Sequence, residues 1–319
     1  MDWFSMLLII CGLALFEIVI SIDNAIINAE VLSTMSRKAR KWFLFWGILI
    51  AVFLVRGLLP WMILWVSTPS LGFLGSFTAS FSSDPAVVKA IQDSAPILLV
   101  GGGTFLVFLF FHWLFLEPKH YGLIGEKFIE RQGAWFFAVA SLLLVTIVWM
   151  AIKMNPLMAL GAVIGSSAFF ISHGFKQNAE QAEKQMIDGS SAMSDISKIF
   201  YLEVIDMSFS IDGVLGAFAF TFVIPLILVG NGIGAVVVRQ LTVANIDKVK
   251  KYKYLKNGAM YSIFTLGSVM IGHSFGLHIP DWFSPVATFL IIGFFFWKSL
   301  QALKEEPHRA KLAKHPPTP

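Results

Sequence analysis

Two short acidic motifs carry the side chains of this sequence that are best suited to chemistry. The first runs from Phe16 to Asn24 as Phe-Glu-Ile-Val-Ile-Ser-Ile-Asp-Asn, and the second from Ile205 to Gly213 as Ile-Asp-Met-Ser-Phe-Ser-Ile-Asp-Gly. An acid, a serine and an aspartate recur at the same spacing in both. Carboxylate, hydroxyl and amide oxygens suit the hard cations Mg²⁺, Ca²⁺ and Mn²⁺, whereas a soft metal prefers cysteine, and Cys11 is the only cysteine. The candidate metal ligands are therefore Glu17, Asp23, Asn24, Asp206, Ser210 and Asp212.

Both motifs lie in apolar runs, so their acids need a compensating charge. An ionised carboxylate at the centre of a bilayer costs about 3 kcal/mol or more. Arg56 and Arg239 follow the motifs at matching positions, because Gly47 and Gly230 precede them by the same interval. The acid–arginine pairs either neutralise an empty cation site or only hold helices together. Secondary candidates for the site are Ser21, Glu203, Arg56 and Arg239.

The composition is that of an integral membrane protein. Of the 319 residues 56% are hydrophobic and only 14% are charged, which excludes an ordinary soluble domain. Lipid requires every backbone polar group to be paired internally, and the alternating pattern of a barrel is missing from the sequence, so the predicted fold class is all-α. About nine spans are expected in a polytopic transmembrane helical bundle. The predicted helices lie near 3–33, 42–66, 96–116, 134–153, 156–175, 199–222, 224–243, 258–277 and 284–302.

Basic segments set the predicted orientation. The segments 37–41 and 248–253 are rich in lysine and arginine and should be cytoplasmic, as should Lys176 and Lys184. An odd number of spans then puts the N-terminus outside and the C-terminus in the cytoplasm. Residues 1–302 form the expected transporter-like membrane domain, and 303–319 are expected to be a disordered tail. Residues 67–95 are compatible with an outer loop or with a re-entrant segment.

The two motifs belong to an inverted internal repeat, with one copy around 3–66 and the other around 199–243. In the predicted topology their helices run in opposite directions, as in transporters whose substrate binds at the bilayer midplane between the copies. Glu17 and Ser21 share a helix face, but Asp23 points about 120° away from Glu17. The acids therefore converge if the helices break near Asn24 and Gly213, or if acids from the two copies meet.

Other polar and glycine-rich positions favour packing roles. His112, His173 and His273 can bind metal or relay protons, but we expect packed or interfacial histidines because no second histidine or acid stands one helical turn away. Gly101-Gly102-Gly103 lacks the lysine of a phosphate loop and predicts close helix packing. Gly161 and Gly165 fit a small-xxx-small packing pattern.

The stretches Phe16 to Ile26 and Leu202 to Val214 resemble the TerC-like integral membrane proteins, the second most closely their uncharacterised longer branch. The resemblance covers about residues 4–300. It implies a bacterial-type inner (plasma) membrane protein linked to tellurite resistance and manganese efflux, with the acidic motifs as the cation site. Gly213 stands where the first motif has Asn24, so the two halves are not equivalent ligands.

We therefore predict a carrier that moves a divalent cation, with Mn²⁺ efflux implied by the resemblance, and that exchanges protons if its carboxylates titrate. The alternative is a membrane scaffold of a metal-stress complex, in which the acids and arginines form structural pairs. No nucleotide-binding or His-Glu-x-x-His pattern is present, so no enzyme activity is expected. The expected partners are the lipid bilayer and the metal ion, with no nucleic acid and no permanently bound cofactor.

Overall fold

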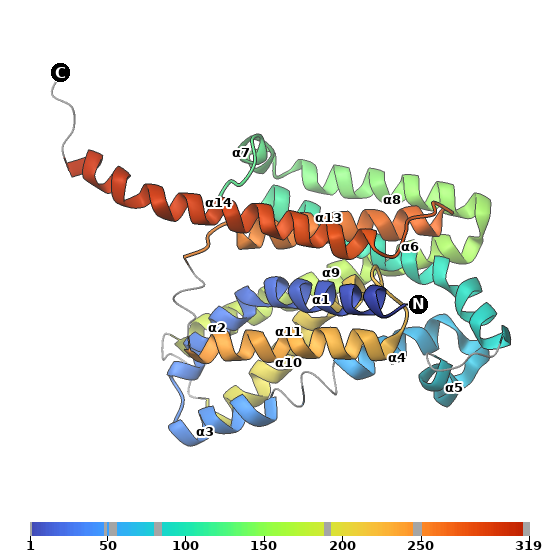
Figure 1. The fold of residues 1–319 in the computed structure, drawn as a ribbon, viewed down its shortest axis with the longest axis horizontal. Coiled ribbons are helices and arrows are strands. Elements are labelled where there is room, and N and C mark those ends of the chain that lie inside the picture. The colour runs from blue at the N-terminus through green and yellow to red at the C-terminus, as the bar shows by residue number, and fades with distance from the viewer. Residues whose placement is uncertain are drawn as a thin grey trace.

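The computed structural model describes residues 2–47, 50, 56–79, 85–187, 193–244 and 251–314. These residues form helices and connecting turns, and no strand occurs among them, which confirms an all-α fold (Figure 1). The α-helices are α1 Trp3–Ile20, α2 Ile22–Ser33, α3 Arg37–Trp42, α4 Arg56–Ser67, α5 Gly72–Ala79, α6 Pro85–Leu116, α7 Glu126–Glu130, α8 Trp135–Met154, α9 Pro156–Ile187, α10 Asp195–Ala217, α11 Ile224–Ala244, α13 Leu255–Ser274 and α14 Phe283–Lys314.

Six of the described helices are long and apolar enough to cross a membrane. They are α1, α6, α8, α9, α11 and α14. The helix α8 shows the pattern of a lipid-facing span, because Trp135, Leu142 and Trp149 are exposed along it. A multi-pass membrane protein is therefore confirmed. The count of about nine spans and the inverted repeat stay predictions, because α10 and α13 carry more polar residues than the six.

The helix expected over 3–33 is divided in two. The first part, α1, ends at Ile20 and α2 begins at Ile22, so the break falls at Ser21, three residues before the predicted position at Asn24. The helix α10, by contrast, continues without interruption through Gly213 to Ala217. Of the two ways in which the acids could converge, helix breaks near Asn24 and Gly213 are therefore seen only in the first motif.

The segments around 42–95 also differ from a simple helix and loop. Phe43–Gly47 forms a π-helical turn directly after α3, and a short 3-10 turn at Pro69–Leu71 separates α4 from α5. The helix pair Gly57–Val66 and Pro69–Ser76 is bent by 101°. The Trp61 indole nitrogen donates to the Phe73 carbonyl oxygen over 3.0 Å, so α5 is folded back against α4. A bend of this kind is compatible with a broken span or with a re-entrant segment.

Two helices extend beyond their predicted ends. The helix α9 continues past residue 175 to Ile187, so Lys176 is a helical residue and not part of a loop. The helix α14 continues to Lys314 across most of the segment 303–319, where a disordered tail was expected. Alanine, leucine, lysine and glutamate favour helix, and these residue types are common in both extensions.

Glycines allow the central helices to approach closely. A Cβ atom on Gly101 would lie 2.8 Å from the carbonyl oxygen of Gly161 in α9, and one on Gly103 would lie 2.8 Å from that of Gly267 in α13. The two contacts confirm the packing role predicted for the glycine run. They place α6 between α9 and α13, which makes it the most enclosed of the six apolar helices (Figure 1).

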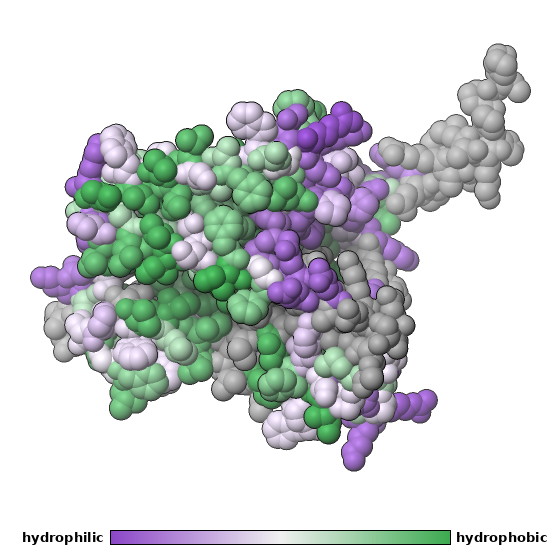
Figure 2. All heavy atoms as spheres, turned by 180° about the vertical axis from the view of Figure 1, so that it is seen from behind, coloured by the Kyte–Doolittle hydropathy of each residue, from purple (hydrophilic) through white to green (hydrophobic). Residues whose placement is uncertain are grey.

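The bundle has two distinct ends. The N-terminus and α5 lie toward one end, whereas α3 and the outgoing part of α14 lie toward the other (Figure 1). The second end carries the basic α3 residues Arg37, Lys38, Arg40 and Lys41, and we call it the basic end. Figure 2 shows hydrophobic side chains over much of one face and hydrophilic ones gathered near the side from which α14 leaves. The placement of the basic end in the cytoplasm stays a prediction of the positive-inside rule.

Candidate cation site

Glu17 lies where α1, α10 and α11 meet. Its side chain is only 1% exposed, and the Ser21 hydroxyl donates to its Oε1 over 2.7 Å, as their shared helix face predicts. A Cβ atom on Gly213 of α10 would lie 2.9 Å from Glu17 Oε2, and one on Gly234 of α11 would lie 2.6 Å from Glu17 Cβ. The two glycines therefore provide the space that this carboxylate occupies.

The helices around Glu17 have defined directions. Phe16 packs on Gly216 and Glu17 on Gly213, so α1 and α10 are antiparallel where the two motifs meet. Leu13 packs on Gly230 and Glu17 on Gly234, so α1 and α11 are parallel. The first motif thus packs against the second along an unbroken α10. The meeting of acids from the two copies stays a prediction.

Asp212, the residue before Gly213, forms a buried ion pair. Its Oδ2 lies 2.6 Å from the Nζ atom of Lys176 in α9, and the two side chains are 12% and 14% exposed. The other oxygen, Oδ1, is buried and has no hydrogen-bond partner among the described residues. Asp212 is therefore neutralised by a flexible lysine and keeps one acceptor atom available.

The rest of the second motif lies elsewhere on α10. Asp206 precedes Asp212 by six residues, which separates them by about 9 Å along the helix axis and puts them on different faces. The Ser210 hydroxyl donates to the Asp206 carbonyl oxygen over 2.7 Å, so it is engaged with its own helix. Asp206 interacts electrostatically with Glu203, one turn earlier. These two acids form a separate group toward the start of α10.

Arg239 lies beside the Glu203–Asp206 group. Its guanidinium group lies 4.1 Å from the centre of the Phe43 ring and donates to the Phe43 carbonyl oxygen. Both the Arg239 Nη2 and the Glu203 Oε1 atoms lie against Gly47 at the end of the π-helical turn. Asp212 is paired with Lys176, so the predicted arginine pairing does not describe this acid. The side chain of Arg56 lies outside the described residues.

Two predicted ligands cannot be placed by their side chains. Asp23 and Asn24 lie in the first turn of α2, just after the break at Ser21, and their side chains lie outside the described residues. Among the described side chains, no three histidine, cysteine, aspartate or glutamate residues are grouped so as to hold a metal ion. The described part of the candidate site thus has two components, the buried Glu17 against Gly213 and the Lys176–Asp212 ion pair, and it is Asp212 that precedes Gly213 in α10.

Sequence reasoning missed Lys176 and the neighbourhood of the histidines. Lys176 follows an apolar run and was interpreted as a cytoplasmic marker, but α9 extends beyond it. The rings of His112 in α6 and His173 in α9 have centroids 3.8 Å apart. The prediction considered only neighbours within one helix and could not detect a pair formed between two. His273 is a packed residue as expected, since its Nε2 contacts the backbone of Ile279.

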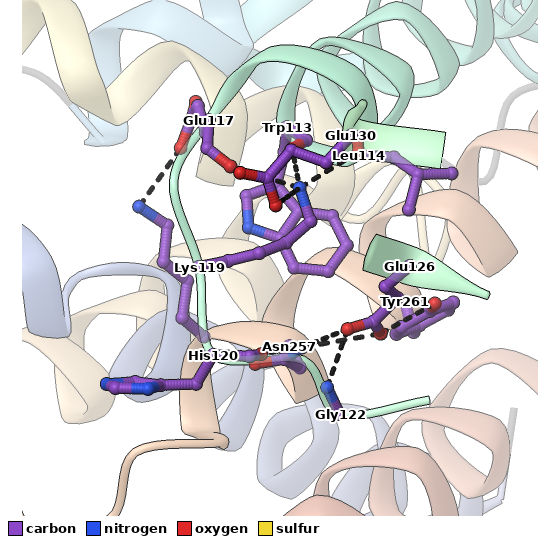
Figure 3. Close-up of polar contacts among 11 residues, drawn as sticks. Trp113, Leu114, Glu117, Lys119, His120, Gly122, Glu126, Glu130, Asn257 and Tyr261 are labelled. Carbon is purple, nitrogen blue, oxygen red and sulfur yellow. Dashed lines mark hydrogen bonds and ion pairs between the residues drawn. The ribbon is translucent and has the colours of Figure 1, made fainter. Parts of the chain in front are cut away.

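A second polar cluster lies between the end of α6 and α13 (Figure 3). The Glu126 carboxylate accepts hydrogen bonds from the Gly122 backbone nitrogen at 2.6 Å, the Asn257 amide at 3.2 Å and the Tyr261 hydroxyl at 2.9 Å. Lys119 donates to the carbonyl oxygens of Trp113, Leu114 and Glu117 at the end of α6. These bonds satisfy carbonyl groups that the helix end leaves unpaired and hold the segment 117–130 against α13.

A protein-family model described as "Protein of unknown function (DUF475)" matches residues 22–306. The matched range includes Asp212, Lys176 and both histidines of the pair, and it begins after Glu17. No curated protein and no solved structure matches the chain significantly.

Proposed function

The chain belongs to the DUF475 family, and we propose that it is a membrane carrier for a hard divalent cation, with Mn²⁺ as its substrate and efflux as its direction. The buried Lys176–Asp212 ion pair, one residue before the glycine on which Glu17 packs, is the observation that carries this proposal. Mn²⁺ is chosen because of the resemblance of both motifs to TerC-like proteins.

The ion pair has the chemistry of a cation site that holds a substitute cation. The lysine ammonium group lies 2.6 Å from Asp212 Oδ2, in the position that a metal ion would take against that oxygen. A divalent cation that enters can displace it and gain Oδ1, which has no hydrogen-bond partner among the described residues. Carboxylate oxygens are the ligands that Mn²⁺ and Mg²⁺ prefer, and Glu17 offers a second carboxylate from α1.

The burial of this ion pair in membrane helices favours a role in ion transport over a role only in holding the helices together. Ionisable groups inside membrane helices are costly, and they commonly mark ion pathways. A buried ion pair contributes little net stability compared with apolar residues of the same shape, so stability alone is a weak reason for its presence. Asp23 in the first turn of α2 and the Glu203–Asp206 group at the start of α10 extend the series of acids toward the basic end. In the proposed carrier they guide the cation, in a bacterial-type inner membrane with the basic end in the cytoplasm.

The experiment is Mn²⁺ flux into liposomes that contain purified protein, measured with a Mn²⁺-sensitive dye. We expect flux with the wild type and a loss of both flux and Mn²⁺ binding with Asp212→Asn and Asp23→Asn. Glu126→Gln is the matched control, because it also neutralises a buried carboxylate but lies in the cluster of Figure 3. If the wild type neither binds nor moves Mn²⁺, and Asp212→Asn lowers only the protein level, the scaffold function replaces the carrier.

A further inference from the structure

The histidine pair joins α6 and α9, and His173 precedes Lys176 of the candidate cation site by three residues in α9. His112 is 7% exposed, in the last part of α6, and its ring contacts His173 of α9 with centroids 3.8 Å apart. The aromatic rings of Phe136 and Phe169 surround His112, with centroids at 5.4 and 6.0 Å. Two imidazole rings are thus held in contact, with aromatic rings on one side of the pair.

One side of the pair reaches the polar cluster of Figure 3. His112 Nδ1 lies 3.4 Å from Glu117 Oε1, and Glu117 Oε2 lies 3.1 Å from the Lys256 ammonium group of α13. Burial alone would raise the pKa of Glu117, but the contacts with His112 and Lys256 lower it to about 2. Glu117 therefore stays anionic at neutral pH, and its side chain is 28% exposed, so water can reach it.

The other side of the pair reaches the cation site. His173 and Lys176 are three residues apart on α9 and share one helix face, and the two side chains interact electrostatically. Lys176 in turn contacts Asp212. Gln177, also one turn from His173, lies with its amide nitrogen 3.3 Å from the His173 Nε2 atom. Polar side chains therefore follow one another from Glu117 through both histidines to Lys176, one helical turn from His173, and its partner Asp212.

We infer that the His112–His173 pair is the proton-binding site of the carrier, and that a proton on this pair and a cation at Glu17 and Asp212 exclude one another. This inference rests on the proposed function. It names the proton as the coupling ion and the basic end, through Glu117, as the side from which that proton arrives.

Charge explains the exclusion. The groups that face the pair are Glu117, which favours a proton there, and Lys176, which disfavours one, with Lys256 and Asp212 one contact further on. Two rings in contact hold one proton but not two, because the second positive charge would be repelled by the first. A protonated pair places a positive charge one helical turn from the cation site and so weakens cation binding. A bound divalent cation weakens proton binding by the same factor, because coupling between two sites is reciprocal.

The test compares Mn²⁺ affinity at pH 8 and pH 6, measured by equilibrium dialysis of the purified full chain. For the wild type we expect the dissociation constant to rise by about tenfold between pH 8 and pH 6, which corresponds to an average of about half a proton released for each Mn²⁺ bound over this range in weakly buffered solution. For His173→Gln and His112→Gln the rise should shrink to about twofold and the proton release should fall. His273→Gln, whose histidine contacts the Ile279 backbone, is the control and should keep the wild-type response.

The outcomes separate this inference from the proposed function. A wild type that does not bind Mn²⁺ at pH 8 contradicts the carrier itself. A wild type that binds Mn²⁺ without proton release, or histidine variants that keep the full pH response, would overturn the histidine site while leaving the carrier in place. Proton release is measured on the wild type, so the test stands even if one variant does not fold.

Discussion

Two buried carboxylates in this protein are stabilised in different ways. Glu126 is 2% exposed and receives hydrogen bonds from a backbone nitrogen, an amide and a hydroxyl, all of them neutral and fixed in place. Asp212 is 9% exposed and has a charged partner at the end of a flexible side chain, while its second oxygen lacks a hydrogen bond among the described residues. Both carboxylates are buried, but Glu126 has hydrogen-bond donors at both of its oxygens, whereas Asp212 has a partner at only one.

The difference separates a structural acid from a functional one. Neutral donors that surround a carboxylate hold the chain in one geometry, and each would lose its partner if the acid left. A lysine that neutralises a carboxylate does so from the end of a flexible side chain, which can move away when another cation arrives. The contrast predicts that changes at Asp212 and its partner alter cation handling, whereas changes at Glu126 alter stability.

The largest expected effect comes from removing the charged partner of Asp212. Lys176→Met leaves a buried carboxylate without its cation and should lower the free energy of unfolding by about 3–5 kcal/mol. The double variant Lys176→Met/Asp212→Asn removes both charges and should regain most of that loss. Equilibrium unfolding in mixed micelles measures both values. A single variant as stable as the wild type would show that Asp212 does not depend on Lys176.

A somewhat smaller loss is expected at the other carboxylate. Glu126→Gln places an amide group among three hydrogen-bond donors, so at least one donor loses its acceptor, and the free energy of unfolding should fall by about 3 kcal/mol. The folded fraction should still bind Mn²⁺ with wild-type affinity. Loss of Mn²⁺ binding in a Glu126→Gln protein that remains folded would contradict the structural role assigned to Glu126 (Figure 3).

The fold was predictable from the sequence wherever a single local pattern, such as an apolar run, determines the position of a helix. Apolar runs gave eight of the helices to within a few residues at one or both ends, and the polar interruptions between them gave the connections. The close packing at Gly101–Gly103 and the contact of Ser21 with Glu17 also followed from helix geometry. Local rules of spacing were sufficient for these features.

The site was harder to predict because it is built between helices. Lys176 stands just past an apolar run, where the positive-inside rule and a buried ion pair give the same local pattern. His112 and His173 lie far apart in the sequence, so their contact depends on the parallel packing of α6 and α9. The break at Ser21 has no proline or glycine to mark it, so the sequence offered a break near Asn24 only as one of two ways to bring the acids together.

A third prediction concerns the space around Glu17. Gly234→Ala would place a Cβ atom 2.6 Å from Glu17 Cβ and 2.8 Å from the Ala14 carbonyl oxygen, and a backbone atom cannot move aside easily. We expect a loss of about 2 kcal/mol in the free energy of unfolding from this overpacking, together with weaker Mn²⁺ binding. Gly174→Ala is the matched control, because nothing lies within 4 Å of the added atom. Equal stability of the two variants would mean that α1 and α11 are not in close contact at Glu17.

The smallest predicted effect on stability concerns Glu117. Like Asp212, it has a lysine partner, Lys256, and it also contacts the ring of His112. Its pKa is lowered from 4.5 to about 2, since these two contacts outweigh burial. The stabilisation is therefore complete above pH 4.5 and is lost as the pH falls toward 2. Because both side chains of the Glu117–Lys256 pair are partly exposed, solvent screening should leave about 1 kcal/mol.

Unfolding of the wild type and of Glu117→Gln at pH 6 and pH 3 measures this contribution. The stability gap between the two proteins should be larger at pH 6 and should narrow at pH 3, whereas the gap between wild type and Gly174→Ala should not change with pH. A gap that stays constant would show that Glu117 is not held ionised by His112 and Lys256. It would also remove the anionic entrance from which the histidine pair receives its proton, so this smallest energy bears directly on how the cation site is coupled to the basic end.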